Sequence, residues 1–199
     1  MKQWIDSAIE RGAVPVVAGQ NGDMDTIGSA IALASIHPSL LACGLHLGRI
    51  AKRLVEDLQA PFRKVTPQGT AFPEKLGGII IVDAAAPDQV GIDLPEVPRL
   101  ILDHHATNGW TLRDGDHMLQ WDVRATTEMV ATYMFEHAIE ALSPPVRKML
   151  LAGMITDTAR FKHANTTSFE VTTKLLQGTK IDYAKFCEYI EREETSPSE

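Results

Sequence analysis

The segment Arg99-Leu100-Ile101-Leu102-Asp103-His104-His105 joins a short apolar run to one carboxylate and two imidazoles. Such a run is typical of a strand buried on both faces, as the inner strands of parallel sheets are. Open α/β sheets bind their ligands outside the carboxyl ends of the strands. Three ligand-capable side chains at a strand end therefore predict a metal or phosphate site at this edge of a sheet.

Two further apolar runs end in acid. One leads through a glycine-containing turn to Asp23 and Asp25, and the other leads directly to Asp83. Because the carboxyl ends of parallel strands meet at one edge, we expect these carboxylates to converge with His104 on one cation site. The two runs cover residues 14–18 and 79–82.

Asp157 ends an apolar, helix-like run and is the remaining candidate acid. A nitrogen ligand from His104 among carboxylates favours Mn²⁺ or a similar transition ion over Ca²⁺. Two ions roughly 3.5–4 Å apart are a standard arrangement for phosphoester cleavage. A structural alternative stays open for single residues, because Asp23 or Asp157 could only cap a helix and Asp103 could only stabilise a turn.

Strand-like and helix-like segments alternate along most of the chain, which predicts an α/β fold. We expect a doubly wound, mainly parallel five-stranded sheet with helices on both faces. Prolines and glycines predict irregular structure over 61–78 and 84–98. The expected strands are 14–18, 40–47, 79–82, 99–103 and 118–121, and the expected helices are 2–11, 26–36, 49–58, 126–142, 144–156, 168–176 and 182–192.

The 199 residues suit one domain, expected over 1–192, with 193–199 as a polar tail or the start of a linker. No apolar run approaches a membrane span and no signal-peptide core is present, so a cytoplasmic protein is the default expectation. The net charge of −7 argues against broad capture of nucleic acid. Cys43 and Cys187 lack the paired spacing of a zinc site and are expected to be buried, reduced thiols.

Taken together, these motifs make the chain resemble the DHH phosphoesterase superfamily over about residues 14 to 190. The resemblance is closest to the branch of nano-RNases and 3'-phosphoadenosine-5'-phosphate phosphatases. Asn-Gly-Asp-Met-Asp-Thr-Ile-Gly-Ser at 21–29 is similar to the first motif, and Asp-His-His at 103–105 is similar to the third. Asp83 and Asp157 correspond to the second and fourth motifs. The segments 122–129 and 153–161 are also similar to the family.

The resemblance implies one metal ion bound by Asp25, Asp83, His104 and Asp157. A second ion would bind Asp23 and Asp83. The expected cofactor is thus one or two Mn²⁺ ions, with Mg²⁺ as an alternative.

The resemblance also implies roles for residues that bind no metal. His105 would contact the substrate phosphate, and Asp103 would orient a histidine from behind. Apart from the resemblance, we expect His105, with the nearby Arg160 or Lys162, to stabilise the negative charge that develops on the phosphate.

Two departures from the family are visible. A histidine that usually completes the second metal site is replaced by Gly19, and the chain stops before the smaller C-terminal substrate-binding domain. The expected function is a metal-dependent phosphoesterase that acts on a phosphomonoester or phosphodiester in a small nucleotide or short oligonucleotide, without a membrane partner.

The alternative is a degenerate DHH domain that binds metal, nucleotide or a protein partner without catalysis. Relatives such as pyrophosphatases or polyphosphatases stay open, as does a homodimer.

Overall fold

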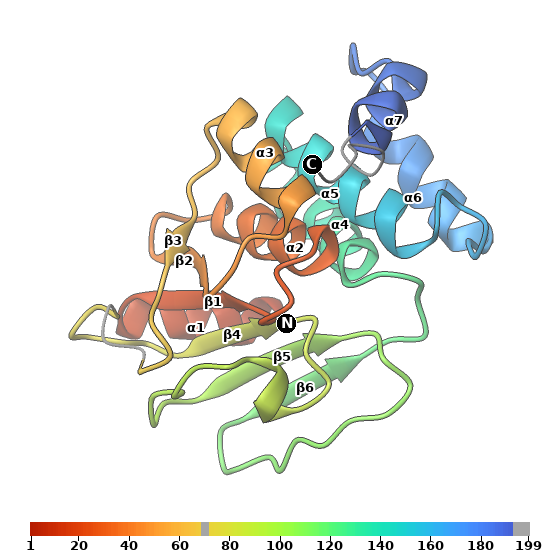
Figure 1. Ribbon diagram of the computed structural model, residues 1–199. Helices are drawn as coiled ribbons and strands as arrows, with labels where there is room; N and C mark the ends of the chain where they lie inside the picture. Colours follow the sequence, from red (N-terminus) through yellow and green to blue (C-terminus); the bar gives the residue numbers. More distant parts are fainter. Residues whose placement is uncertain (69–71, 193–199) are drawn as a thin grey trace, which may run out of the picture.

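The computed structural model describes residues 1–68 and 72–192, and its centre is a parallel β-sheet (Figure 1). The sheet has six strands in the order β3-β2-β1-β4-β5-β6. The α/β class and the parallel sheet are confirmed. The strands are β1 (Val14–Ala18), β2 (Leu40–Gly44), β3 (Arg63–Lys64), β4 (Ile79–Val82), β5 (Arg99–Asp103) and β6 (His117–Gln120).

The sheet has one strand more than expected, because β3 lies in the segment predicted to be irregular. Its two residues, Arg63 and Lys64, pair with Cys43 and Gly44 at the edge of the sheet. A short, charged edge strand resists pairing with other chains, and two exposed residues give no periodic signal in a sequence. The expected polar tail, 193–199, lies outside the described residues.

The helices follow the expected segments with small shifts at their ends. Asp23 caps α2 by accepting a hydrogen bond from the Thr26 N–H, so this helix begins two residues earlier than expected. Asn165 and Ser168 form a capping box that starts α6. The helices are α1 (Lys2–Arg11), α2 (Met24–Ala34), α3 (Arg49–Leu58), α4 (Thr126–His137), α5 (Pro144–Asp157), α6 (Thr166–Leu176) and α7 (Tyr183–Glu191), with 3-10 turns η1 (Pro87–Gln89) and η2 (Ile139–Ala141).

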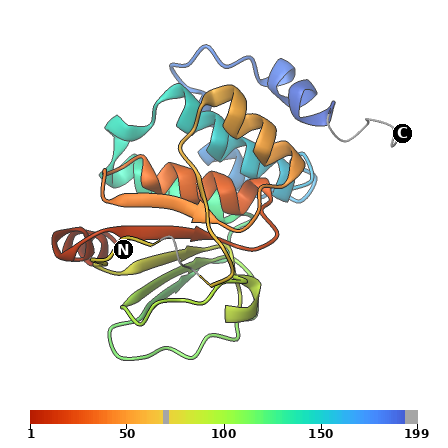
Figure 2. The same ribbon diagram turned by 60° about the vertical axis from the view of Figure 1, so that its left-hand side comes forward.

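Most helices gather on one face of the sheet in successive layers (Figure 2). Helix α2 packs on β1, β2 and β4, and α4 packs on β5. Helix α5 then packs on α2 and α4, and α6 packs on α4 and α5. In Figure 1, α7 lies at the far side of this layer from the sheet.

The opposite face is covered by loops and η1 instead of the second helix layer that we expected. Val17, Ile81 and Ile101 on this face pack with Val90 and Trp110 from the segments that follow β4 and β5. Those connections are rich in proline and glycine or too short for a long helix, which explains the difference.

Helices α2 and α5 approach closely and run in opposite directions. A Cβ atom added to Gly28 would lie 2.6 Å from the carbonyl oxygen of Met149, and one added to Gly153 would lie 3.1 Å from the Cα of Asp25. These glycines let the start of α2 lie beside the end of α5. The contact brings Asp157 to Asp25, two residues far apart in the sequence. Along residues 1–68 and 72–192, no helix has both the length and the apolar character needed to cross a bilayer.

Candidate metal centre

The carboxyl edge of the sheet collects the side chains that the sequence singles out. Asp25 lies in the first turn of α2 after β1, Asp83 follows β4, and the Asp103–His105 segment ends β5. Asp157 is the last residue of α5. Three strand ends and one helix end therefore contribute to one cluster.

His104 lies at the centre of this cluster. Its Nε2 is 3.7 Å from Oδ2 of Asp25, 3.5 Å from Oδ1 of Asp83 and 3.5 Å from Oδ2 of Asp157. The potential ligand atoms of Asp25, His104 and Asp157 all lie within 4.8 Å of one another. The structure thus brings together the four residues expected to bind one ion.

Asp25 is held by the start of α4. Its Oδ2 accepts a hydrogen bond from the Thr126 N–H at 2.7 Å, and its Oδ1 accepts from the N–H and hydroxyl of Thr127 at 2.8 and 2.6 Å. Because Ala125 precedes α4 and has no capping side chain, the buried Asp25 carboxylate supplies that cap. Sequence reasoning missed this role of Thr126 and Thr127; the absence of a capping residue at position 125 was the available signal.

Asp83 adopts a left-handed backbone conformation, with φ of 56°. Aspartate tolerates this region better than most residues with a side chain, although it is uncommon. The Thr126 hydroxyl donates to Oδ1 of Asp83 at 3.2 Å. Thr126 therefore contacts two of the potential metal ligands, through its backbone to Asp25 and through its hydroxyl to Asp83.

His105 and Asp103 form a hydrogen-bonded pair next to the cluster, and potential ligand atoms of Asp83, His104 and His105 also lie within 4.8 Å of one another. Nδ1 of His105 lies 2.7 Å from Oδ1 of the fully buried Asp103, a distance that favours the tautomer with the proton on Nδ1. The His105 side chain is 46% exposed, so its other nitrogen is accessible to a ligand. Nδ1 of His105 is also 3.9 Å from Oδ1 of Asp83.

The expected second metal position has fewer nearby donors. Asp23 caps α2 through Oδ1 and accepts from the Asn21 side chain through Oδ2 at 2.6 Å. At Gly19, an added Cβ would lie 2.9 Å from the carbonyl oxygen of Asp83, closer than real Cβ atoms approach. The position at which the family carries a histidine is therefore closed to any side chain unless the backbone moves.

The basic residues after Asp157 are exposed. Nε of Arg160 lies 2.8 Å from Oε1 of Glu191 on α7, which directs part of the guanidinium toward that helix. Lys162 and His163 are exposed in the turn that precedes α6. Arg160 thus has an ion-pair partner outside the carboxylate cluster.

Burial and neighbouring charges shift the pKa values of the residues in the cluster. Burial, followed by repulsion from Asp83 and Asp157, raises the pKa of Asp25 well above its usual value. Partial burial raises the pKa of Asp157 to about 6, with Asp83 adding to the rise and His104 opposing it. Burial opposes the charged form of His104, but its hydrogen bond with Asp83 and the surrounding carboxylates raise its pKa to about 9. A divalent cation would replace the proton of His104 and offset the repulsion.

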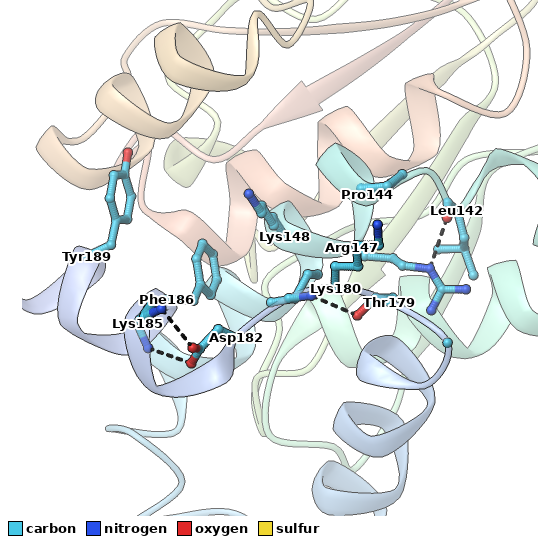
Figure 3. Close-up of a pocket in the computed structure, with 12 residues that line it drawn as sticks. Leu142, Pro144, Arg147, Lys148, Thr179, Lys180, Asp182, Lys185, Phe186 and Tyr189 are labelled. Atoms are coloured by element: carbon cyan, nitrogen blue, oxygen red, sulfur yellow. Dashed lines mark hydrogen bonds and ion pairs between the residues drawn. The ribbon is translucent and has the colours of Figure 1, made fainter.

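A cavity also lies away from this cluster, at the end of α5 opposite Asp157 (Figure 3). It measures about 720 Å³ and lies between the start of α5 and α7. Arg147 lies in the wall of this cavity, and its guanidinium donates hydrogen bonds to the carbonyl oxygens of Leu142, Lys174 and Leu175. Pro144 and Pro145 remove two N–H donors from the start of α5, so this helix end is a poor anion site.

The fold and the cluster define an α/β protein with a carboxylate–imidazole centre at the carboxyl edge of its sheet. The family model described as "DHH family, N-terminal domain" matches residues 13–155. The chain therefore belongs to the DHH family. The similarity that we inferred from the Asp-His-His motif is confirmed.

Individual relatives are distant. Uncharacterized protein MJ0988 of Methanocaldococcus jannaschii is 26% identical over 177 residues, which cover 85% of this chain and 52% of the relative. This chain thus spans about half the length of that curated relative.

The fold is shared by solved structures, of which two serve as examples. One is a Methanococcus jannaschii protein provisionally named a family II inorganic pyrophosphatase, with a TM-score of 0.70, 24% identity, and coverage of 89% of this chain and 60% of that one. The other is an exopolyphosphatase-related protein from Bacteroides fragilis, with a TM-score of 0.66, 16% identity, and coverage of 100% and 60%.

Proposed function

We propose that this chain is the metal-binding domain of a phosphoesterase that hydrolyses a phosphomonoester or phosphodiester bond. The substrate class that we propose is a small nucleotide or a short oligonucleotide. The observation that carries the proposal is the position of His104, whose Nε2 lies 3.5–3.7 Å from three carboxylates at the carboxyl edge of the sheet. Membership of the DHH family supports it.

The donor set fits a divalent transition metal. Asp25, Asp83, His104 and Asp157 would hold one ion through three carboxylates and one imidazole, a mixture that suits Mn²⁺, with Mg²⁺ as the alternative. When bound, the metal would lower the pKa of a water molecule and neutralise charge on the phosphate. Asp23 and Asp83 offer a second, less complete site.

The remaining residues would position the substrate. His105, held by Asp103 through Nδ1, would donate from its other nitrogen to a phosphate oxygen when protonated. Thr126 and Thr127 would keep Asp25 in one orientation through the hydrogen bonds at the start of α4. Arg160 would reach the substrate only by leaving Glu191, so its contribution is the weaker part of the proposed site.

A second candidate function is binding without catalysis. The specific observation in its favour is Gly19, where the backbone of Asp83 leaves no room for the histidine that usually completes the second site. In that case the domain would hold one ion and recognise a nucleotide or a protein partner. Gly19→His is expected to disturb the turn rather than to restore a ligand.

Metal analysis and hydrolysis assays test the proposal. Protein incubated with Mn²⁺ and then desalted is expected to retain at least one ion and to hydrolyse a phosphodiester or a dinucleotide. His104→Ala should lose both properties, while His117→Ala, at an exposed histidine on β6, should keep them. Metal retention without hydrolysis would favour the binding function, and failure to retain any metal would refute both.

A further inference from the structure

A cavity of about 610 Å³ opens beside the two imidazoles of the candidate metal centre. His104 and His105 line it together with Ala106 and the segment 120–124, which begins at the last residue of β6. Binding sites for small molecules measure roughly 300–1,000 Å³. The cavity is therefore large enough to hold more of a substrate than the phosphate group that faces the metal ligands.

The cavity wall is tied to the Asp-His-His segment. Asp103 pairs with Gln120 in the register of β5 and β6, and the Trp121 N–H donates to the carbonyl oxygen of Asp103 at 3.2 Å. The side chain of Gln120 donates to the carbonyl oxygen of His105 and accepts from the side chain of Asn108. These bonds fix the position of Trp121 relative to His105.

Trp121 gives the cavity an apolar wall next to charged groups. The residue is 38% exposed, although tryptophan is usually well buried. Arg124 and Asp122, one cation and one anion, lie on the same segment. A heterocyclic base can stack on an indole, whereas inorganic pyrophosphate has no apolar surface that could contact it.

We propose that Trp121 is a specificity-determining residue that stacks on the base of a nucleotide substrate, while Arg124 contacts an adjacent phosphate. This inference rests on the proposed phosphoesterase function and refines its substrate class. It predicts a preference for nucleotide esters over pyrophosphate and polyphosphate, the substrate types named for the two structurally similar proteins.

Hydrolysis of two substrates tests the preference. Trp121→Ala is expected to lower kcat/KM for a dinucleotide about tenfold, in line with the contribution of base stacking, and to leave hydrolysis of pyrophosphate unchanged. Trp121→Phe should restore most of the loss, because phenylalanine keeps an aromatic face. Leu112→Ala, which truncates a 46% exposed apolar residue outside the cavity, should change neither rate. An equal loss for both substrates in Trp121→Ala would overturn the proposal.

A binding measurement separates this proposal from the proposed function. Calorimetric titration of the full chain with Mn²⁺ present should show tighter binding of adenosine 5'-monophosphate than of inorganic phosphate. Trp121→Ala should weaken the binding of adenosine 5'-monophosphate and leave the binding of inorganic phosphate unchanged. Equal affinities in the wild type would refute the role of Trp121 even if the chain hydrolyses phosphoesters. If the chain hydrolyses neither substrate, the phosphoesterase function fails, while the difference in affinity still decides whether Trp121 recognises a base.

Discussion

Asp25 and Asp157 both face His104, but their surroundings differ. Asp25 is buried and accepts three hydrogen bonds from Thr126 and Thr127, whereas the Asp157 side chain is 32% exposed. A carboxylate that accepts backbone hydrogen bonds in the interior contributes to folding as well as to ligand binding. The two aspartates should therefore respond differently to the same chemical change.

We predict that Asp157→Asn lowers the affinity for Mn²⁺ at least tenfold and leaves the stability of the metal-free protein unchanged or slightly higher, because it removes a carboxylate whose charge is disfavoured by partial burial and by repulsion from Asp83. Asp25→Asn should lower the affinity too, but it should also destabilise the fold by about 1–3 kcal/mol, since its amide group would face N–H donors of α4. Calorimetric metal titration and denaturant unfolding without metal measure the two effects. Equal stability of the two variants would contradict the proposed role of the α4 start.

The pKa values of the cluster predict that metal binding depends on pH. With a pKa of about 9, His104 is mostly protonated at pH 7 in the metal-free protein, and Asp157, with a pKa of about 6, is mostly ionised. A metal needs both groups deprotonated, so its affinity should fall as the pH drops below 6 and rise as the pH increases from 7 to 9.

At pH 7, binding should release at least one proton, because His104 must lose its proton to bind the metal. Titrations in two buffers of different ionisation enthalpy measure this release. An affinity that is flat between pH 6 and 9, without proton release, would show that His104 is not a ligand.

At the level of elements, the site depends on how closely α2 and α5 pack. Gly28 and Gly153 lie where the two helices meet, and Cβ atoms there would collide with Met149 and Thr127 respectively. Since the Thr127 hydroxyl also donates a hydrogen bond to Asp25, a change in this helix contact should alter the position of a candidate metal ligand.

We predict that Gly28→Ala destabilises the protein by about 1–3 kcal/mol, because the new methyl group would lie 2.6 Å from a backbone oxygen. In an uncrowded helix the same change would stabilise the protein by up to about 1 kcal/mol. The sign of the change in the free energy of unfolding therefore tells whether close packing or helix propensity dominates. Urea unfolding measures the change. Thr173→Ala, on the exposed side of α6, serves as a control and should have a small effect.

Across the whole molecule, the candidate ligands connect segments that are far apart in sequence. Asp25 lies at the start of α2, Asp83 and His104 directly follow β4 and β5, and Asp157 ends α5. A metal that binds all four would therefore stabilise the folded chain against unfolding, and it would also offset the repulsion among their carboxylates.

Mn²⁺ at about 100 times its dissociation constant should stabilise the protein by about 2.7 kcal/mol, and for a chain of this size that corresponds to a rise in Tm of roughly 5–10 °C. Thermal unfolding with Mn²⁺ and with a chelator measures the shift. Asp83→Asn should lose most of it, whereas Asp88→Asn, in the exposed turn η1, should retain it. An unchanged shift in the Asp83 variant would mean that the ion binds elsewhere.

Much of the fold and the list of candidate ligands could be predicted from local sequence. Buried parallel strands require apolar runs, and the polar residues that follow each run mark the edge where ligands bind, so Asp25, Asp83 and His104 stand out. Membership of the DHH family follows from the same motifs. The length of α4 was overestimated, because an apolar pattern continues past His137 into Ala138 and η2.

Only the tertiary structure decided how those residues are supported. Thr126 and Thr127 hold Asp25 across 101 and 102 residues of sequence, and no local pattern reports such a contact. The closed space at Gly19, the helices gathered on one face and the partner of Arg160 likewise depend on distances between remote segments. Residue types and their local order determined which groups could bind a metal, whereas packing between distant segments decided which of them face one another.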